Sequence, residues 1–221
     1  MTVTVAEFQD RAELADALAN RVATELRTAI GTKGTASFAV PGGTTPGPFL
    51  TALSGASVDW VHVRATLTDE RQVPESHERS NARLVRETLM QGAAGAATFL
   101  PLNDPYAANV ALADHLPLDA VVLGMGNDLH TASLFPGASA LGTALSPPDD
   151  CHAMAIEAPG APEPRVTLTA PTLSGAAFVA ILITGDDKRA SLEKAMATGP
   201  VEDAPVRAIL TATDVTVYWA P

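Results

Sequence analysis

Two glycines, a carboxylate and a histidine stand close together in the segment 124–130 (GMGNDLH). An unperturbed histidine has a pKa of about 6.5, so its neutral form can accept a proton near neutral pH. Asp128, two residues before His130, could orient the imidazole and stabilise the imidazolium that forms. The glycines permit a tight turn with open backbone N–H groups. This pattern favours His130 as a general base over a purely structural histidine.

A second candidate segment, 41–46 (PGGTTP), follows an apolar run. Gly42 and Gly43 let backbone N–H groups approach a ligand closely, and Thr44 adds a hydroxyl donor. A helix that begins near Pro46 would favour an anion at its N-terminus. The same pattern also occurs as a structural turn, so both interpretations stay open here.

The formal net charge of −11 matters for any anionic substrate. Such a substrate would need a local group of cations, and Arg71, Arg165 and Lys188 are the candidates. The planar fork of Arg71 could hold a phosphate or a carboxylate, or could pair with Asp69 or Glu70 in the same loop. Arg165 and Lys188 could equally be surface charges.

Several other chemistries find little support in the sequence. Ser133 lacks the Gly-x-Ser-x-Gly elbow of a nucleophilic serine, so we interpret it as a loop hydroxyl. The histidines and Cys151 lack zinc-ligand spacing, and no dinucleotide fingerprint is present. A zinc site and a dinucleotide site are therefore weakly supported. The acidic surface also disfavours partners with exposed phosphates, namely nucleic acids and anionic membranes.

Strands and helices alternate along the chain. The patterns predict strands at 36–40, 61–67, 119–123, 176–184 and 215–219, and helices at 11–30, 81–90, 106–115 and 186–197. This alternation predicts a single α/β domain over residues 1–221, with a mainly parallel sheet covered on both faces. Ligands bind outside the carboxyl ends of such strands, where the candidate segments lie.

The sequence also indicates a compartment. Residues 1–10 lack a basic region followed by a long apolar core, so we expect no secretory signal. The apolar run 176–183 is far shorter than the ~20 residues that span a bilayer. A single cysteine argues for a reducing compartment. We expect a cytoplasmic protein that is a monomer or a weak homodimer.

Together the motifs resemble the 6-phosphogluconolactonase family. The resemblance rests on GGTTP at 42–46, DERQVP at 69–74 followed by Ser80-Asn81, and GMGNDLHTASLFPG at 124–137. Later segments at 165–167 and 185–188 also look like blocks of that family. The matches keep their order over roughly residues 36–190, and the block around His130 is the most specific.

The resemblance implies a three-layer α/β/α sandwich around a mostly parallel sheet, similar to glucosamine-6-phosphate deaminase and ribose-5-phosphate isomerase. It implies hydrolysis of 6-phospho-D-glucono-1,5-lactone in the oxidative pentose phosphate pathway, without cofactor or metal. His130 would be the base, with Asp128 beside it. The implied ligand contacts are Gly42, Gly43, Thr44, Arg71, Arg165 and Lys188.

One residue departs from the family pattern. Leu129 stands where the family usually has glycine, and a leucine at positive φ would be strained by roughly 1–3 kcal/mol. Either the turn uses an ordinary conformation, or the geometry of His130 is shifted. Two rival functions remain: an amino-sugar-phosphate deaminase or isomerase on the same fold, and a non-catalytic sugar-phosphate sensor.

Overall fold

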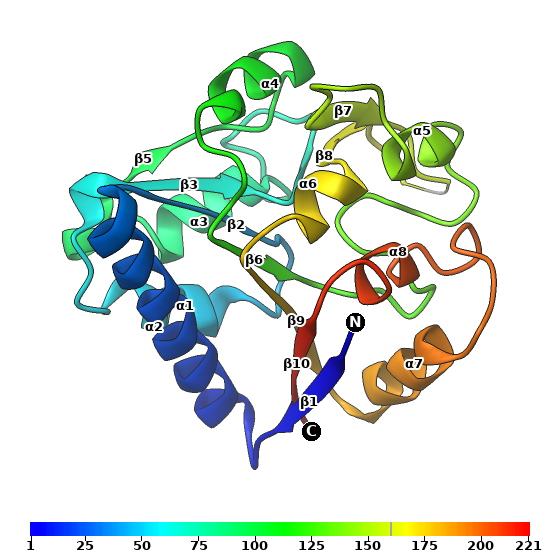
Figure 1. The fold of residues 1–221 in the computed structure, drawn as a ribbon, viewed down its shortest axis with the longest axis horizontal. Helices are drawn as coiled ribbons and strands as arrows, with labels where there is room; N and C mark the ends of the chain where they lie inside the picture. Colours follow the sequence, from blue (N-terminus) through cyan, green and yellow to red (C-terminus); the bar gives the residue numbers. More distant parts are fainter. Residues whose placement is uncertain (160) are drawn as a thin grey trace.

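Seven parallel strands form the central sheet of the computed structural model, which describes residues 1–159 and 161–221 (Figure 1). Their order is β1-β10-β9-β6-β2-β3-β5, and every neighbouring pair is parallel. The strands are β1 (Val3–Glu7), β2 (Ala36–Val40), β3 (Val63–Leu67), β5 (Thr98–Phe99), β6 (Ala120–Leu123), β9 (Phe178–Thr184) and β10 (Val215–Ala220).

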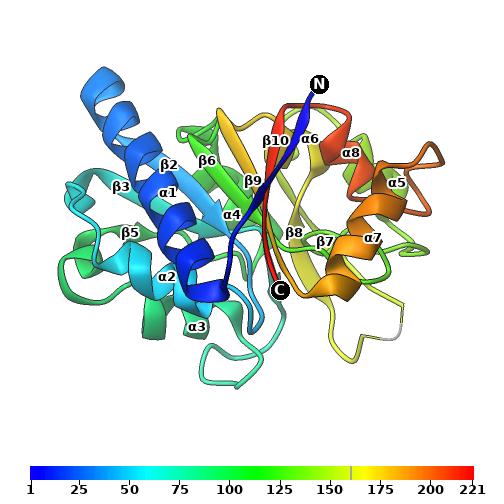
Figure 2. The same cartoon turned by 90° about the horizontal axis from the view of Figure 1, so that it is seen from below.

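Helices cover both faces of this sheet. Figure 2 shows α1–α3 on one side and α5, α7 and α8 on the other. Every residue of β2 and of β6 is buried, as expected for strands covered on two faces. The helices are α1 (Arg11–Lys33), α2 (Gly47–Ser54), α3 (Asn81–Thr88), α4 (Pro105–Ala113), α5 (Leu141–Leu145), α6 (Ala170–Ser174), α7 (Asp186–Met196) and α8 (Arg207–Leu210), with short 3₁₀ turns at Trp60–His62 and Gly92–Ala96.

The long helix α1 illustrates how the sequence sets these elements. Asp10 caps it by accepting hydrogen bonds from the backbone N–H groups of Ala12 and Glu13. Gly34 ends it in the left-handed conformation, at φ 80°. Gly31 lies inside the helix. The helix therefore runs three residues beyond the predicted 11–30.

A second, smaller sheet was not expected from the sequence. Its order is β4-β8-β7, and both pairs are antiparallel. The strands are β4 (Asp69–Arg71), β7 (Ala153–Ile156) and β8 (Arg165–Leu168). Thr68 joins the two sheets, because its N–H donates to Val40 in β2 while its carbonyl accepts from Leu168 in β8. The small sheet thus stands at the carboxyl end of β3.

The direction in which successive strands are added across the large sheet reverses between β2 and β6, and these two strands pair with each other near its centre. From β2 the chain proceeds outward through β3 to β5, and from β6 it proceeds the other way through β9 to β10. Such a switch point leaves a crevice at the carboxyl ends of the strands. The predicted α/β/α architecture is confirmed. Among the described residues, no helix is long and apolar enough to cross a bilayer.

Candidate active site

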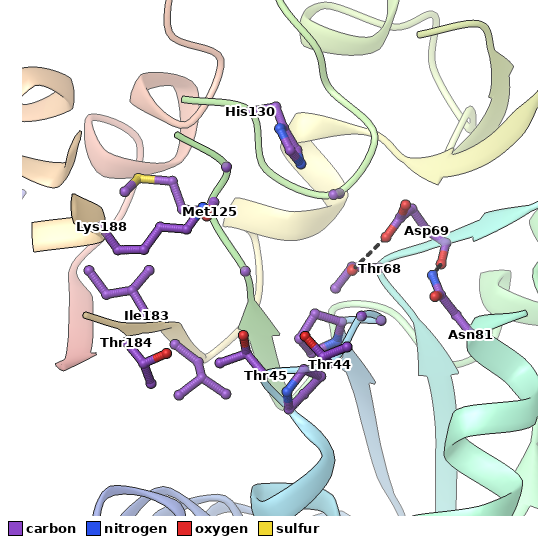
Figure 3. A pocket seen from close by; sticks show the side chains of 18 of the residues that line it. Thr44, Thr45, Thr68, Asp69, Asn81, Met125, His130, Ile183, Thr184 and Lys188 are labelled. Carbon is purple, nitrogen blue, oxygen red and sulfur yellow. Dashed lines mark hydrogen bonds between the residues drawn. The ribbon is translucent and has the colours of Figure 1, made fainter. Parts of the chain in front are cut away.

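A cavity of about 250 Å³ lies at this switch point. Its walls come from the loops after β2 (41–46), β3 (68–71) and β6 (124–132), with Lys188 of α7. Figure 3 shows His130 facing Thr44 and Thr45 across the cavity, with Lys188 and Asp69 on opposite sides. His130 and all six expected ligand contacts line it: Gly42, Gly43, Thr44, Arg71, Arg165 and Lys188. The structure therefore brings the chain-distant candidates together.

His130 and Asp128 form a hydrogen-bonded pair. The distance from Nδ1 of His130 to Oδ1 of Asp128 is 2.5 Å. A carboxylate on Nδ1 favours the tautomer with the proton on that nitrogen, which leaves the lone pair on Nε2. The His130 side chain is 27 % exposed. The imidazole can therefore meet water or a ligand while Asp128 orients it.

The charge state of Asp128 suits this arrangement. Partial burial alone would raise the pKa of Asp128, but the hydrogen bond and the charge of His130 together outweigh it. The pKa of Asp128 is therefore lower than usual. Asp128 is a carboxylate at neutral pH and can stabilise a protonated imidazole beside it.

The turn before His130 needs a glycine at position 126 and a positive φ angle at position 129. A Cβ atom at Gly126 would overlap the side chains of both His130 and Asp128. Leu129 adopts φ 66°, the left-handed region that favours glycine. Of the two alternatives left open for Leu129, the ordinary conformation is therefore wrong. Its N–H donates to the carbonyl of Gly126 (3.1 Å) and its carbonyl accepts from Val206 (3.1 Å), so the surroundings hold the strained residue in place.

The glycine turn after β2 approaches another part of the site closely. A Cβ atom at Gly42 would overlap the carboxamide of Asn81. That carboxamide donates from Nδ2 to the carbonyl of Asp69 at 2.8 Å. Gly43 adopts φ 92°, so a glycine is also favoured there. Close approach and positive φ together explain the Gly-Gly pair.

Arg165 is buried in the wall of the cavity, at 7 % exposure. Its Nη1 lies 3.5 Å from Oδ2 of Asp69. Burial lowers the pKa of Arg165, and the charge of Asp69 opposes this effect. Its Nε is buried without a hydrogen-bond partner in the described structure. Arg165 is therefore not the surface charge that the sequence left possible.

Arg71 stands directly opposite Arg165 in the β4–β8 ladder. Like charges in such a pair repel, so an anion between them would be stabilising. Nη1 of Arg71 donates to the carbonyl of Arg79 (2.6 Å), and its Nε is buried without a partner among the described residues. The alternative of a loop salt bridge is wrong for the described residues: Asp69 accepts from Ser133 and pairs with Arg165, and Glu70 accepts from backbone N–H groups, including that of Arg71, but not from its guanidinium.

Lys188 adds a third positive charge, on the side of the cavity opposite Asp69. Its ammonium donates to the carbonyl of Met125 at 2.8 Å, which fixes it beside the His130 turn (Figure 3). Burial lowers the pKa of Lys188, and the charge of Asp128 works against this. Arg71, Arg165 and Lys188 thus form a local cationic group in an acidic protein.

Sequence reasoning left three residues of this region out of the site. Asp69 and Asn81 line the cavity, and both fall within the quoted family motifs, which was the available signal. Ser133, interpreted as a loop hydroxyl, is fully buried and donates to Oδ2 of Asp69 at 2.5 Å. Glu70 accepts from the N–H groups of Asn81 (2.8 Å) and Ala82 (2.7 Å), so it holds the start of α3.

Known proteins resemble this chain over nearly its whole length. The family model for glucosamine-6-phosphate isomerases/6-phosphogluconolactonase matches residues 9–219. A 6-phosphogluconolactonase of Mesorhizobium japonicum is 48 % identical, over 97 % of this chain and 94 % of its own. One of Rhizobium meliloti is 42 % identical over 100 % of both chains. A crystal structure of a 6-phosphogluconolactonase from Shewanella baltica superposes with a TM-score of 0.94 at 34 % identity, over 99 % of this chain and 98 % of that one. This chain belongs to the glucosamine-6-phosphate isomerase/6-phosphogluconolactonase family.

Proposed function

We propose that this protein is a carboxylic ester hydrolase that converts 6-phospho-D-glucono-1,5-lactone to 6-phospho-D-gluconate in the oxidative pentose phosphate pathway. Relatives that are 42–48 % identical to this chain are named 6-phosphogluconolactonase, which agrees with the activity expected from the sequence. One observation carries the proposal: a histidine oriented by a carboxylate opens onto the same cavity as three cationic side chains.

In the proposed reaction His130 acts first as a base. Its Nε2 takes a proton from a water molecule as the water oxygen attacks C1 of the lactone. Asp128, already bonded to Nδ1, stabilises the imidazolium. The bond between C1 and the ring oxygen then breaks, and His130 returns the proton to that oxygen. Water is the only co-reactant, so the proposal includes no cofactor and no metal.

The cationic group would hold the anionic substrate. Arg71, Arg165 and Lys188 supply positive charge, and the backbone N–H groups of Gly42 and Gly43 supply further donors. A donor from this set could also stabilise the oxyanion that develops at C1. The whole protein has a net charge of −11, but these cations line the cavity, so the cavity itself can still attract an anionic substrate.

The geometry bears on the rival functions. With Leu129 at φ 66°, His130 is still hydrogen-bonded to Asp128, which is the arrangement that an acid–base catalyst needs. This arrangement favours an enzyme over a non-catalytic sugar-phosphate sensor. An amino-sugar-phosphate deaminase or isomerase would use the same fold, so the assay must separate the two activities.

A direct assay tests the proposal. The lactone is made in place from glucose 6-phosphate by glucose-6-phosphate dehydrogenase, and its disappearance is compared with spontaneous hydrolysis. Accelerated disappearance supports the lactonase. Ammonia release from glucosamine 6-phosphate without lactone hydrolysis would support the rival enzyme, and binding of 6-phosphogluconate without turnover would support the sensor.

We also propose that the protein works in the cytoplasm as a monomer or weak homodimer, and that it has no nucleic-acid or membrane partner. The single cysteine, Cys151, suits a reducing compartment, and the net charge of −11 opposes binding to phosphate polymers and anionic lipid. Sedimentation at several protein concentrations would test the oligomeric state.

A further inference from the structure

Ser133 occupies an unusual position for a loop hydroxyl. It lies three residues after His130 and has no exposed surface. Its hydroxyl donates to Oδ2 of Asp69 at 2.5 Å, and its N–H donates to Oγ1 of Thr167 at 3.2 Å. Both hydrogen bonds join Ser133 to the small sheet, one to β4 and one to β8, although both strands are distant from Ser133 in the sequence.

The two partners of Ser133 form a single site on that sheet. Asp69 and Thr167 are directly opposite each other in the β4–β8 ladder, and Arg71 and Arg165 are the opposite pair two residues along. Residues two apart in a strand point to the same face of the sheet. Ser133 therefore docks onto the face that carries both arginines of the cavity.

The hydroxyl of Ser133 also contacts one of those arginines. Nη1 of Arg165 lies 3.4 Å from Oγ of Ser133 and 3.5 Å from Oδ2 of Asp69. A hydroxyl has one proton to give and lone pairs to accept with. The hydrogen bonds consequently run in one direction, from Arg165 to Ser133 and from Ser133 to Asp69. This direction leaves Ser133 no proton for another acceptor and excludes it as a nucleophile activated by His130.

The turn that carries Ser133 is closely tied to His130. Leu134 donates to the carbonyl of Thr131 at 2.9 Å, which closes the turn. The hydroxyl of Thr131 donates to the carbonyl of Gly124 at 2.8 Å, at the start of the loop that carries Asp128 and His130. A movement of Ser133 would therefore move His130 as well.

From this geometry we infer that Ser133 is a positioning residue for catalysis, which sets the distance between His130 on the large sheet and the arginines on the small sheet. The inference rests on the proposed function. Ser133 is fully buried and is not among the residues that line the cavity, so it acts through the two groups that it holds apart. Asp69 serves as its anchor.

The test compares Ser133→Ala with the wild type. We expect kcat to fall about 10- to 100-fold, because misplacement by about 1 Å costs up to roughly 10²-fold. The Kd of 6-phosphogluconate should change much less, because Asp69 still contacts Arg165. Titration calorimetry gives the Kd, and the coupled assay gives kcat per folded molecule.

Ser37→Ala is the matched control. Ser37 is also buried, and its hydroxyl donates to the carbonyl of His115 at 2.7 Å and lies 3.4 Å from Oδ2 of Asp119. It sits at the opposite end of β2 from the cavity. We expect Ser37→Ala to lower the free energy of unfolding, as Ser133→Ala does, but to leave kcat unchanged.

Thr167→Val gives a second, independent measurement. It removes the acceptor of the Ser133 N–H, so kcat should fall in the same direction. The double variant should lose less than the product of the two single effects, since both act on one contact. A kcat of Ser133→Ala equal to that of the wild type would overturn the inference, whereas an inactive wild type would overturn the proposed function instead.

Discussion

The imidazole of His130 is stacked on the ring of Phe135, with centroids 3.9 Å apart and planes at 23°. The guanidinium of Arg165 lies over the same ring, 5.2 Å from its centroid. His130 is thus fixed by two independent contacts, one through Nδ1 to Asp128 and one through its ring face. Phe135 also links His130 to Arg165 of the small sheet.

Removing this stack should impair catalysis without abolishing it. We expect Phe135→Leu to lower kcat roughly two- to tenfold, the equivalent of the 0.5–1.5 kcal/mol that an aromatic pair contributes. Phe135→Tyr keeps the ring and should lose less. Steady-state kinetics on folded protein measure both. Equal losses in the two variants would contradict a role for the stack.

His130→Ala tests the base directly. A lost acid–base group lowers the rate by about 10²–10⁴-fold, and we expect kcat to fall by at least this range. The fall should occur with little change in the affinity for 6-phosphogluconate, since the cations remain. The assay must subtract spontaneous hydrolysis of the lactone. Near-normal turnover in this variant would remove His130 from the role.

The cationic group is tested with two substrates. Arg71→Ala and Lys188→Ala should mainly raise KM for the phosphorylated lactone, because each removes a charge from the cavity wall. An unphosphorylated gluconolactone should be affected less. Arg21→Ala is a control for the change in net charge, since Arg21 lies on α1 and pairs with Glu25. Equal effects on both substrates would count against phosphate binding by Arg71 or Lys188.

The backbone at Leu129 makes a prediction about stability. At φ 66° a side chain with a Cβ costs roughly 1–2 kcal/mol. Leu129→Gly should therefore have a higher free energy of unfolding than Leu129→Ala by about 1 kcal/mol, as measured by urea denaturation. Gly31→Ala, inside α1 with free space around the added Cβ, is the control and should show the opposite preference. An alanine variant at 129 as stable as the glycine variant would refute the strain.

Local patterns predicted much of the fold. Five of the seven strands of the large sheet, four helices and the convergence of strand ends follow from periodicity and from the rules of parallel sheets, whereas β1 and β5 lie outside the predicted strands. The small sheet does not follow from them, because β4 has three residues and pairs with β8 nearly a hundred residues later. Such pairing depends on how the chain folds back, which no local pattern in 69–71 or 165–168 records.

The same limit applies to the site. The pair of Asp128 and His130 is separated by one residue, so the sequence could suggest it. The contact of Ser133 with Asp69 spans 64 residues, and that of Arg165 with Ser133 spans 32. These contacts exist only after the two sheets have met. At Leu129 the departure from the family pattern points to the turn, but the φ angle depends on how the folded chain holds that turn.

The division of labour between the two sheets has an evolutionary consequence. The histidine belongs to a loop of the large sheet, whereas Arg71 and Arg165 belong to paired strands of the small one. Under the proposed function, substitutions in β4 or β8 would change which anionic group is bound, while the loop that carries His130 keeps its structure. In such a scaffold the specificity for the anionic group would change through the small sheet, without a change in the large one.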